Sequence, residues 1–197
     1  MRHKLIAIFS VVLSLATACA PKERTLHIVT TGDVHGSWFD EPYVEGQATK
    51  TSLMSVKAWV DSLRQAAGKQ NVLLLDAGDC LQGDNAAFYY NYFSTEGEHP
   101  FVQLVSYMGY DAVAVGNHDI ETGHPVYDKV NDQLRARGIP FLAANATAAD
   151  GQPYFTPYKI YRRGEMDVFG EINLTSICHK WIASTALCSW QACSSSR

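Results

Sequence analysis

Several apolar stretches of the chain have the pattern of β-strands. Residues 25–31 are rich in β-branched side chains that alternate with polar ones, whereas residues 71–77 and 111–115 are nearly continuous runs of Val, Leu and Ala. Continuous runs of this length are typical of strands that are buried on both faces of a sheet. Two further strands are predicted over residues 139–144 and 154–161.

Helical periodicity separates these strands. Apolar residues recur every three or four positions over residues 52–67, 100–108 and 125–137, and Gly68 and Gly109 follow the first two segments as helix-ending residues. Strands that alternate with helices of this length indicate crossover units and a mostly parallel sheet. The pattern therefore predicts an α/β fold, whose strands end at one shared edge where ligands bind.

Length and charge add few constraints. The chain has 197 residues and a formal net charge of -4, with both signs scattered along it. This length suits one globular domain. No basic stripe is present of the kind that would favour nucleic acid as a partner.

The N-terminus has the layout of a signal peptide over residues 1–18. A positively charged start precedes an apolar run over residues 5–15, and small residues then lead to Cys19. This arrangement resembles the bacterial lipoprotein pattern, which implies a lipid anchor on Cys19 and a tether over residues 19–25. Plain cleavage and a retained anchor are the alternatives. We expect an exported protein, held at the cell envelope by lipid or located in the periplasm.

The five cysteines do not predict a disulfide framework across the core. Cys178, Cys188 and Cys193 crowd into the last twenty residues, and Cys80 stands alone in the middle of the chain. We expect Cys80 to be a small buried side chain beside a strand end.

Potential metal ligands follow three successive strands. Asp33 and His35 come after the first, Asp79 after the second, and Asn117 with His118 after the third. Carboxylate, imidazole and amide groups together suit Mn²⁺, Zn²⁺ or Fe²⁺ better than Ca²⁺. Each motif alone is weak evidence, but their succession at strand ends predicts a shared metal site.

Three short motifs carry a family resemblance. Residues 33–36 read Asp-Val-His-Gly, residues 78–79 read Gly-Asp, and residues 116–119 read Gly-Asn-His-Asp. They resemble the signature of the calcineurin-like metallophosphoesterases, and are most similar to the bacterial branch of 5'-nucleotidases and 2',3'-cyclic-nucleotide phosphodiesterases. The resemblance covers residues 26–163. It implies the N-terminal half of a four-layer α/β/β/α sandwich.

The resemblance also implies two divalent metal ions and their ligands. Asp33 and His35 would hold the first ion, Asp79 would bridge both ions, and Asn117 would bind the second. Two cations bridged by a carboxylate lower the pKa of a shared water and neutralise charge on the phosphoryl oxygens.

His118 has a different role in that family. It would face the phosphate and help the leaving group depart, oriented by a carboxylate three residues later. That carboxylate is Glu121 in this chain, where the family more often has Asp, and Asp119 could serve instead. Glu121 and His118 are therefore the candidate catalytic residues.

The resemblance implies hydrolysis of phosphate esters, with nucleotides as the small-molecule substrate. Two alternatives stay open: a catalytically inactive surface fragment or binding module, and a phosphoesterase of another exported substrate. The family's later Gly-His-x-His loop is not found, because the one histidine after His124 is His179. We expect an incomplete domain over residues 26–163. Our hypothesis is a frameshift or truncation, which would make residues 164–197 a non-native continuation.

Overall fold

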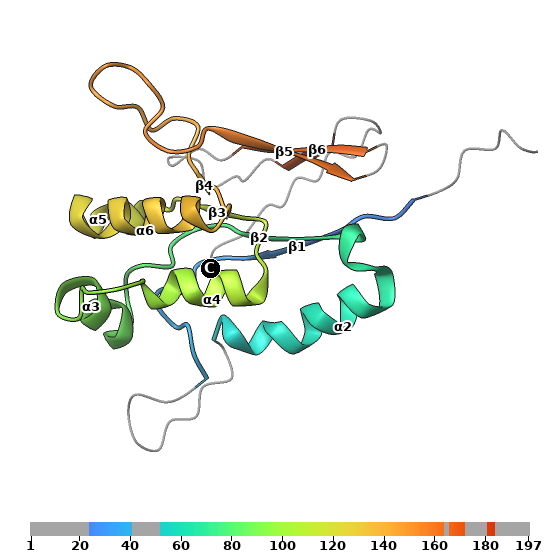
Figure 1. The fold of residues 1–197 in the computed structure, drawn as a ribbon, viewed down its shortest axis with the longest axis horizontal. Helices are drawn as coiled ribbons and strands as arrows, with labels where there is room; N and C mark the ends of the chain where they lie inside the picture. The colour runs from blue at the N-terminus through green and yellow to red at the C-terminus, as the bar shows by residue number, and fades with distance from the viewer. Residues whose placement is uncertain (1–23, 41–51, 164–165, 172–180, 184–197) are drawn as a thin grey trace, which may run out of the picture.

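The computed structural model describes residues 24–40, 52–163, 166–171 and 181–183. Two β-sheets and one layer of helices make up this part of the chain (Figure 1). In chain order the elements are β1 (His27–Thr31), η1 (Met54–Val56), α2 (Lys57–Ala67), η2 (Lys69–Asn71), β2 (Val72–Asp76), α3 (Asn85–Tyr92), α4 (Pro100–Met108), β3 (Ala112–Ala114), α5 (Asn117–Glu121), α6 (His124–Ala136), β4 (Phe141–Leu142), β5 (Tyr158–Arg163), β6 (Met166–Glu171) and β7 (Trp181–Ala183).

The first sheet is parallel and has the strand order β1-β2-β3-β4. Strand β2 lies inside it, and all five of its residues are buried. Its side chains alternate between two separate cores: Val72 and Leu74 pack with the helices, whereas Leu73 and Leu75 pack towards the second sheet. The continuous apolar run over residues 71–77 is therefore explained by burial on both faces, as predicted.

Three layers follow from these two cores. Figure 1 shows β5 and β6 on one side of β1 and β2, with α2 and α4 on the other. The helix-side core joins α2, α4 and α6 to the sheet, and the smaller core places Tyr161 of β5 and Val168 of β6 against β2. The α/β prediction with a parallel sheet is confirmed.

The helices agree well with the sequence pattern. Helix α4 has the predicted bounds, and Gly109 ends it in the left-handed conformation. Agreement is poorer at the last strands, because β4 contains two residues and β5 begins at Tyr158 rather than Tyr154. Tyr154 and Phe155 instead pack on Tyr127 of α6, with ring centroids 6.1 and 5.9 Å away.

Five of these elements lie outside the sequence prediction, including the three-residue helix η2. Helix α3 is rich in exposed aromatic side chains, so it lacks the one-sided apolar stripe that predicts a helix. Helix α5 has five residues, and β7 has three, which is too short for a period to be recognised. Strand β6 pairs antiparallel with β5, so regular pairing continues past residue 163.

Several N-terminal predictions concern residues outside the described ones, including the signal peptide over 1–18 and the lipidation of Cys19. Cys178, Cys188 and Cys193 also lie outside them. Within the described residues, no helix combines the length and apolar character needed to cross a membrane. Cys80 is free and fully buried, as expected.

Candidate metal centre

The candidate ligands lie at the carboxyl ends of the parallel strands, in the loops after β1 and β2 and at the start of α5 after β3. Asp33, His35 and Asp79 all have positive φ, at 56°, 46° and 58°. These left-handed conformations are uncommon for residues other than glycine, and they persist where the surroundings hold them. Two backbone hydrogen bonds of 2.9 Å tie the loops together, from Asp33 N to Gly78 O and from His35 N to Asp79 O.

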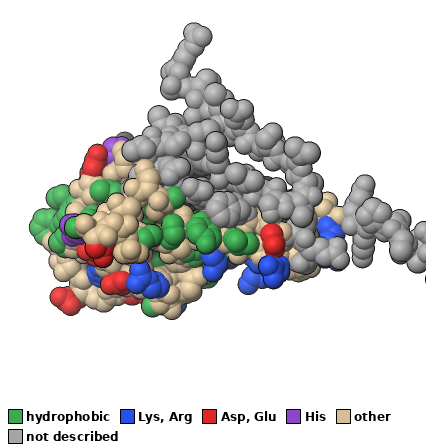
Figure 2. Space-filling view, turned by 90° about the horizontal axis from the view of Figure 1, so that it is seen from above, with side chains coloured by type: hydrophobic (Ala, Val, Ile, Leu, Met, Phe, Trp, Pro, Cys, Tyr) green, Lys and Arg blue, Asp and Glu red, His purple; other side chains and the backbone are tan. Residues whose placement is uncertain are grey.

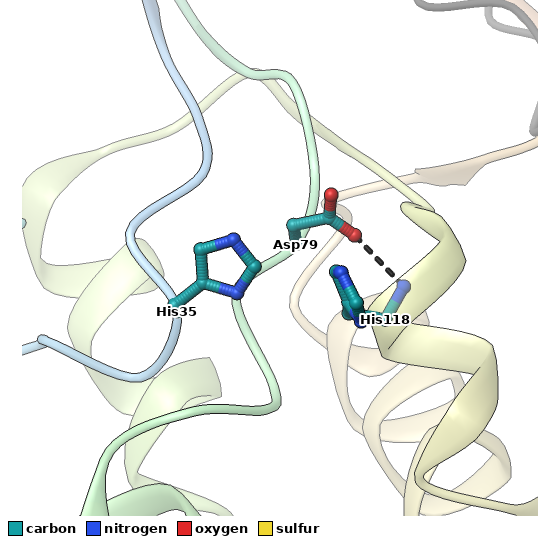
Figure 3. Close-up of side chains that lie close together, drawn as sticks. All are labelled: His35, Asp79 and His118. Carbon is teal, nitrogen blue, oxygen red and sulfur yellow. Dashed lines mark hydrogen bonds between the residues drawn. The ribbon is translucent and has the colours of Figure 1, made fainter.

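Three side chains converge at this edge of the sheet. Potential ligand atoms of His35, Asp79 and His118 all lie within 4.8 Å of one another. Figure 3 shows the two imidazoles on either side of the Asp79 loop, and the dashed line marks the His118 N–H that donates to Asp79 Oδ1 over 2.9 Å. The imidazole ring centroids are 5.1 Å apart.

Histidine and acidic side chains gather at one end of the molecular surface. In Figure 2 the visible histidines and most visible acidic side chains lie at the end of the molecule where Figure 1 places α3, α5 and α6. Lysine and arginine side chains lie mostly towards the middle and the opposite end. An accumulation of imidazole and carboxylate at one end suits the binding of a cation.

Asp119 holds the loop that contains Asp79 through hydrogen bonds to its backbone. Its side chain is fully buried. Its Oδ1 accepts hydrogen bonds from Cys80 N and Leu81 N, both 2.8 Å long, and its Oδ2 accepts from Asp79 N at 3.0 Å and Gly116 N at 2.8 Å. Burial raises the pKa of Asp119 to about 6, and the backbone donors act in the opposite direction.

The carbonyl groups of the same loop are also bound. Trp38 Nε1 donates to Cys80 O over 2.9 Å, and Asn91 Nδ2 donates to Leu81 O over 2.7 Å. Asn91 in turn accepts from His99 Nε2 at 3.0 Å, while His99 Nδ1 accepts from the Phe101 N–H. Burial lowers the pKa of His99 to about 4, so this histidine is neutral and structural near pH 7.

A close backbone approach brings the β2 and β3 loops together. A Cβ atom on Gly116 would lie 2.1 Å from Asp79 Oδ1 and 2.4 Å from Asp79 N. Because no side chain can be accommodated there, the glycine allows the start of α5, which carries Asn117 and His118, to lie directly against Asp79.

The side chain of His118 has two further partners. Its Nδ1 lies 2.9 Å from Glu121 Oε2 and 2.9 Å from Gln82 Oε1. The hydrogen bond to Glu121 raises the pKa of His118. Glu121, rather than Asp119, therefore contacts this imidazole. Gln82 is absent from the sequence prediction, and its position three residues after Asp79 in the same loop is the signal that could have found it.

The remaining predicted ligands lie around this group. Asp33 follows β1 beside Gly78. The pKa of Asp76 is raised mainly because Asp76 is buried, and the negative charge of Asp33 raises it further. Asn117 is exposed and is the first residue of α5, directly before His118. Asp33 is not a member of the three-residue group within 4.8 Å.

The donor chemistry fits a transition-metal ion. Two imidazoles and one carboxylate form a mixed nitrogen and oxygen set. The nearby thiol of Cys80 is not part of it, because it is buried and donates a hydrogen bond to Asp76 Oδ1 over 3.0 Å. Such sets suit Zn²⁺, Mn²⁺ and Fe²⁺. His35 and Asp79 could therefore hold a metal ion, with His118 beside it.

Comparisons with known proteins agree with this geometry. A 5'-nucleotidase from Bos taurus is 30% identical over 177 residues, which cover 84% of this chain and 29% of the relative. A 2',3'-cyclic-nucleotide 2'-phosphodiesterase/3'-nucleotidase from Haemophilus influenzae is 28% identical, over 82% of this chain and 24% of the relative. The solved structure of the calcineurin-like phosphoesterase YfkN from Bacillus subtilis superposes with a TM-score of 0.60 at 24% identity, over 80% of this chain and 45% of that one.

The chain is similar in sequence to 5'-nucleotidases and 2',3'-cyclic-nucleotide phosphodiesterases, and it shares the fold of the calcineurin-like phosphoesterases. It matches their N-terminal part, as the three sequence motifs imply. No protein-family model matches it. The chain spans less than a third of the length of the bovine and Haemophilus relatives.

Proposed function

We propose that this chain contributes the metal-binding part of a phosphoesterase that hydrolyses nucleotides. The observation that carries the proposal is the convergence of His35, Asp79 and His118 from two loops and the start of α5. The activities for which the relatives are named, 5'-nucleotidase and 2',3'-cyclic-nucleotide phosphodiesterase, suggest the substrate class.

The proposed metal ligands are Asp33, His35, Asp79 and Asn117, which would hold two divalent cations. Such cations act as Lewis acids that lower the pKa of water and neutralise charge on a phosphoryl group. The protein's own contribution is a rigid cradle, because every N–H and C=O group from Asp79 to Leu81 has a hydrogen-bond partner within the chain. Ligands held in place beforehand need no reorganisation when charge develops.

His118 is proposed as the group that donates a proton to the leaving oxygen, with Glu121 accepting from Nδ1. In a protonated His118, Nδ1–H is directed at Glu121 and Nε2–H is the second donor. The backbone N–H of the same residue holds Asp79 Oδ1, so one residue joins the leaving-group donor to a metal ligand.

Export to the cell envelope is part of the same proposal and rests on the residues before Cys19 and on Cys19 itself. Incorporation of labelled palmitate into the wild type and into Cys19→Ala tests it. Equal labelling of both proteins would rule out lipidation at Cys19.

The catalytic proposal is tested with the full 197-residue chain, Mn²⁺, AMP and 2',3'-cyclic AMP. Asp79→Ala is expected to lose both Mn²⁺ binding, measured by calorimetry, and hydrolysis. His118→Ala is expected to keep most Mn²⁺ binding but to lose hydrolysis by about 10²-fold or more. Equal activity in all three proteins would refute the assignment.

Two variants serve as matched controls. His27→Ala removes an imidazole at the start of β1, the opposite edge of the sheet, and Asp132→Ala removes an exposed carboxylate of α6. Both should retain Mn²⁺ binding and hydrolysis at the wild-type level.

A further inference from the structure

His118 has two hydrogen-bond acceptors at one ring nitrogen. Glu121 Oε2 and Gln82 Oε1 both lie 2.9 Å from Nδ1. A carboxylate only accepts, so Nδ1 must carry the hydrogen in the pair with Glu121. The amide of Gln82 must then present its oxygen, because its NH₂ group would face a second donor. The geometry therefore assigns one shared Nδ1–H and two acceptors.

The two acceptors differ in how firmly they are held. Glu121 is the last residue of the five-residue helix α5, and 54% of its side chain is exposed. Gln82 is half-buried and directly follows Leu81, whose N–H donates to Asp119 and whose C=O accepts from Asn91. The exposed glutamate has more rotamer freedom to lose than a half-buried side chain of the same length that starts from a fixed loop.

We infer that Gln82 is a positioning residue for His118, and that it fixes the imidazole with Nδ1 protonated beside the Asp79 loop. This inference rests on the proposed function of His118. A neutral amide adds an acceptor without adding charge, so Gln82 sets ring orientation while leaving the charge of the site unchanged. Its contact with His118 also joins the loop after β2 to α5. The hydrogen bond from the His118 N–H to Asp79 Oδ1 makes a second connection between the same two segments.

The first test is independent of activity. Long-range ¹H–¹⁵N spectra of the metal-free full chain report which ring nitrogen of His118 carries the hydrogen at a pH where the ring is neutral. The wild type is expected to show the Nδ1–H form. Gln82→Ala should shift the population towards the Nε2–H form, and Gln82→Glu, which keeps an acceptor oxygen at this position, should restore it.

The second test separates positioning from binding. With Mn²⁺ and a nucleotide, Gln82→Ala should lower kcat about fivefold, which corresponds to about 1 kcal/mol. KM and Mn²⁺ affinity should stay within about twofold, because Gln82 is not among the proposed ligands. Gln65→Ala, at an exposed position of α2, is the matched control and should change neither the spectrum nor kcat.

The outcomes are distinct. An unchanged His118 spectrum in Gln82→Ala would overturn the inference, and so would a loss of Mn²⁺ affinity as large as the loss of kcat. If the wild type binds Mn²⁺ but hydrolyses no phosphate ester, the proposed function fails. The spectra would still decide whether Gln82 orients the ring.

Discussion

Replacing Asp119 by Asn should loosen the loop that carries Asp79. The buried carboxylate accepts two N–H groups on each oxygen, at 2.8 to 3.0 Å. An amide retains one accepting oxygen, so two buried N–H groups would face an NH₂ donor instead. Each unsatisfied buried donor costs about 1–3 kcal/mol. Asp119→Asn is therefore expected to lower the free energy of unfolding by about 2–6 kcal/mol, a large share of a typical domain's stability.

Urea denaturation followed by tryptophan fluorescence measures this change, since the buried Trp38 binds Cys80 O in the affected loop. Asp132→Asn is the control, because this residue of α6 is exposed and should change stability by less than about 0.5 kcal/mol. A loss below about 1 kcal/mol in Asp119→Asn would refute the view that this carboxylate holds the loop.

Three further predictions follow from the same contacts. Because the pKa of His99 is about 4 in the folded protein and about 6.5 when unfolded, the unfolded chain binds more protons between these values. Stability from this residue should thus be complete above pH 6.5 and fall by about 3 kcal/mol towards pH 4, as measured by urea denaturation across pH. Gly116→Ala should weaken Mn²⁺ binding and lower stability by about 1–3 kcal/mol, because its Cβ would meet Asp79. Tyr154→Phe should cost about 0.5–1.5 kcal/mol, because the hydroxyl donates to Asp128 over 2.6 Å.

Each of these predictions has an outcome that contradicts it. His99→Gln removes the titrating ring, so an identical pH dependence of stability in this variant and the wild type would exclude His99 as the cause. Wild-type Mn²⁺ affinity in Gly116→Ala would show that the close approach to Asp79 is unnecessary. For Tyr154→Phe, unchanged hydrogen exchange in residues 143–157 would show that the hydroxyl does not hold this connection.

Much of the fold was predictable because it depends on local periodicity. The run from Val72 to Leu75 indicates a doubly buried strand, and the two separate cores on either side of β2 account for it. Helix α4 was located correctly from its apolar face and the following Gly109. Helix α3 is not predicted because aromatic side chains such as Phe88 and Tyr89 are exposed rather than gathered in a core-facing stripe.

The sequence by itself determined the kinds of group available and the strand ends from which they project. The motifs containing Asp33, Asp79 and Asn117 were sufficient to indicate the family and the edge of the sheet. Only the tertiary structure decided that Glu121 rather than Asp119 contacts His118, and that Gln82 joins them. The physical reason is that Asp119 and Glu121 are two residues apart on α5, so the helix directs one inward to backbone donors and leaves the other beside the imidazole.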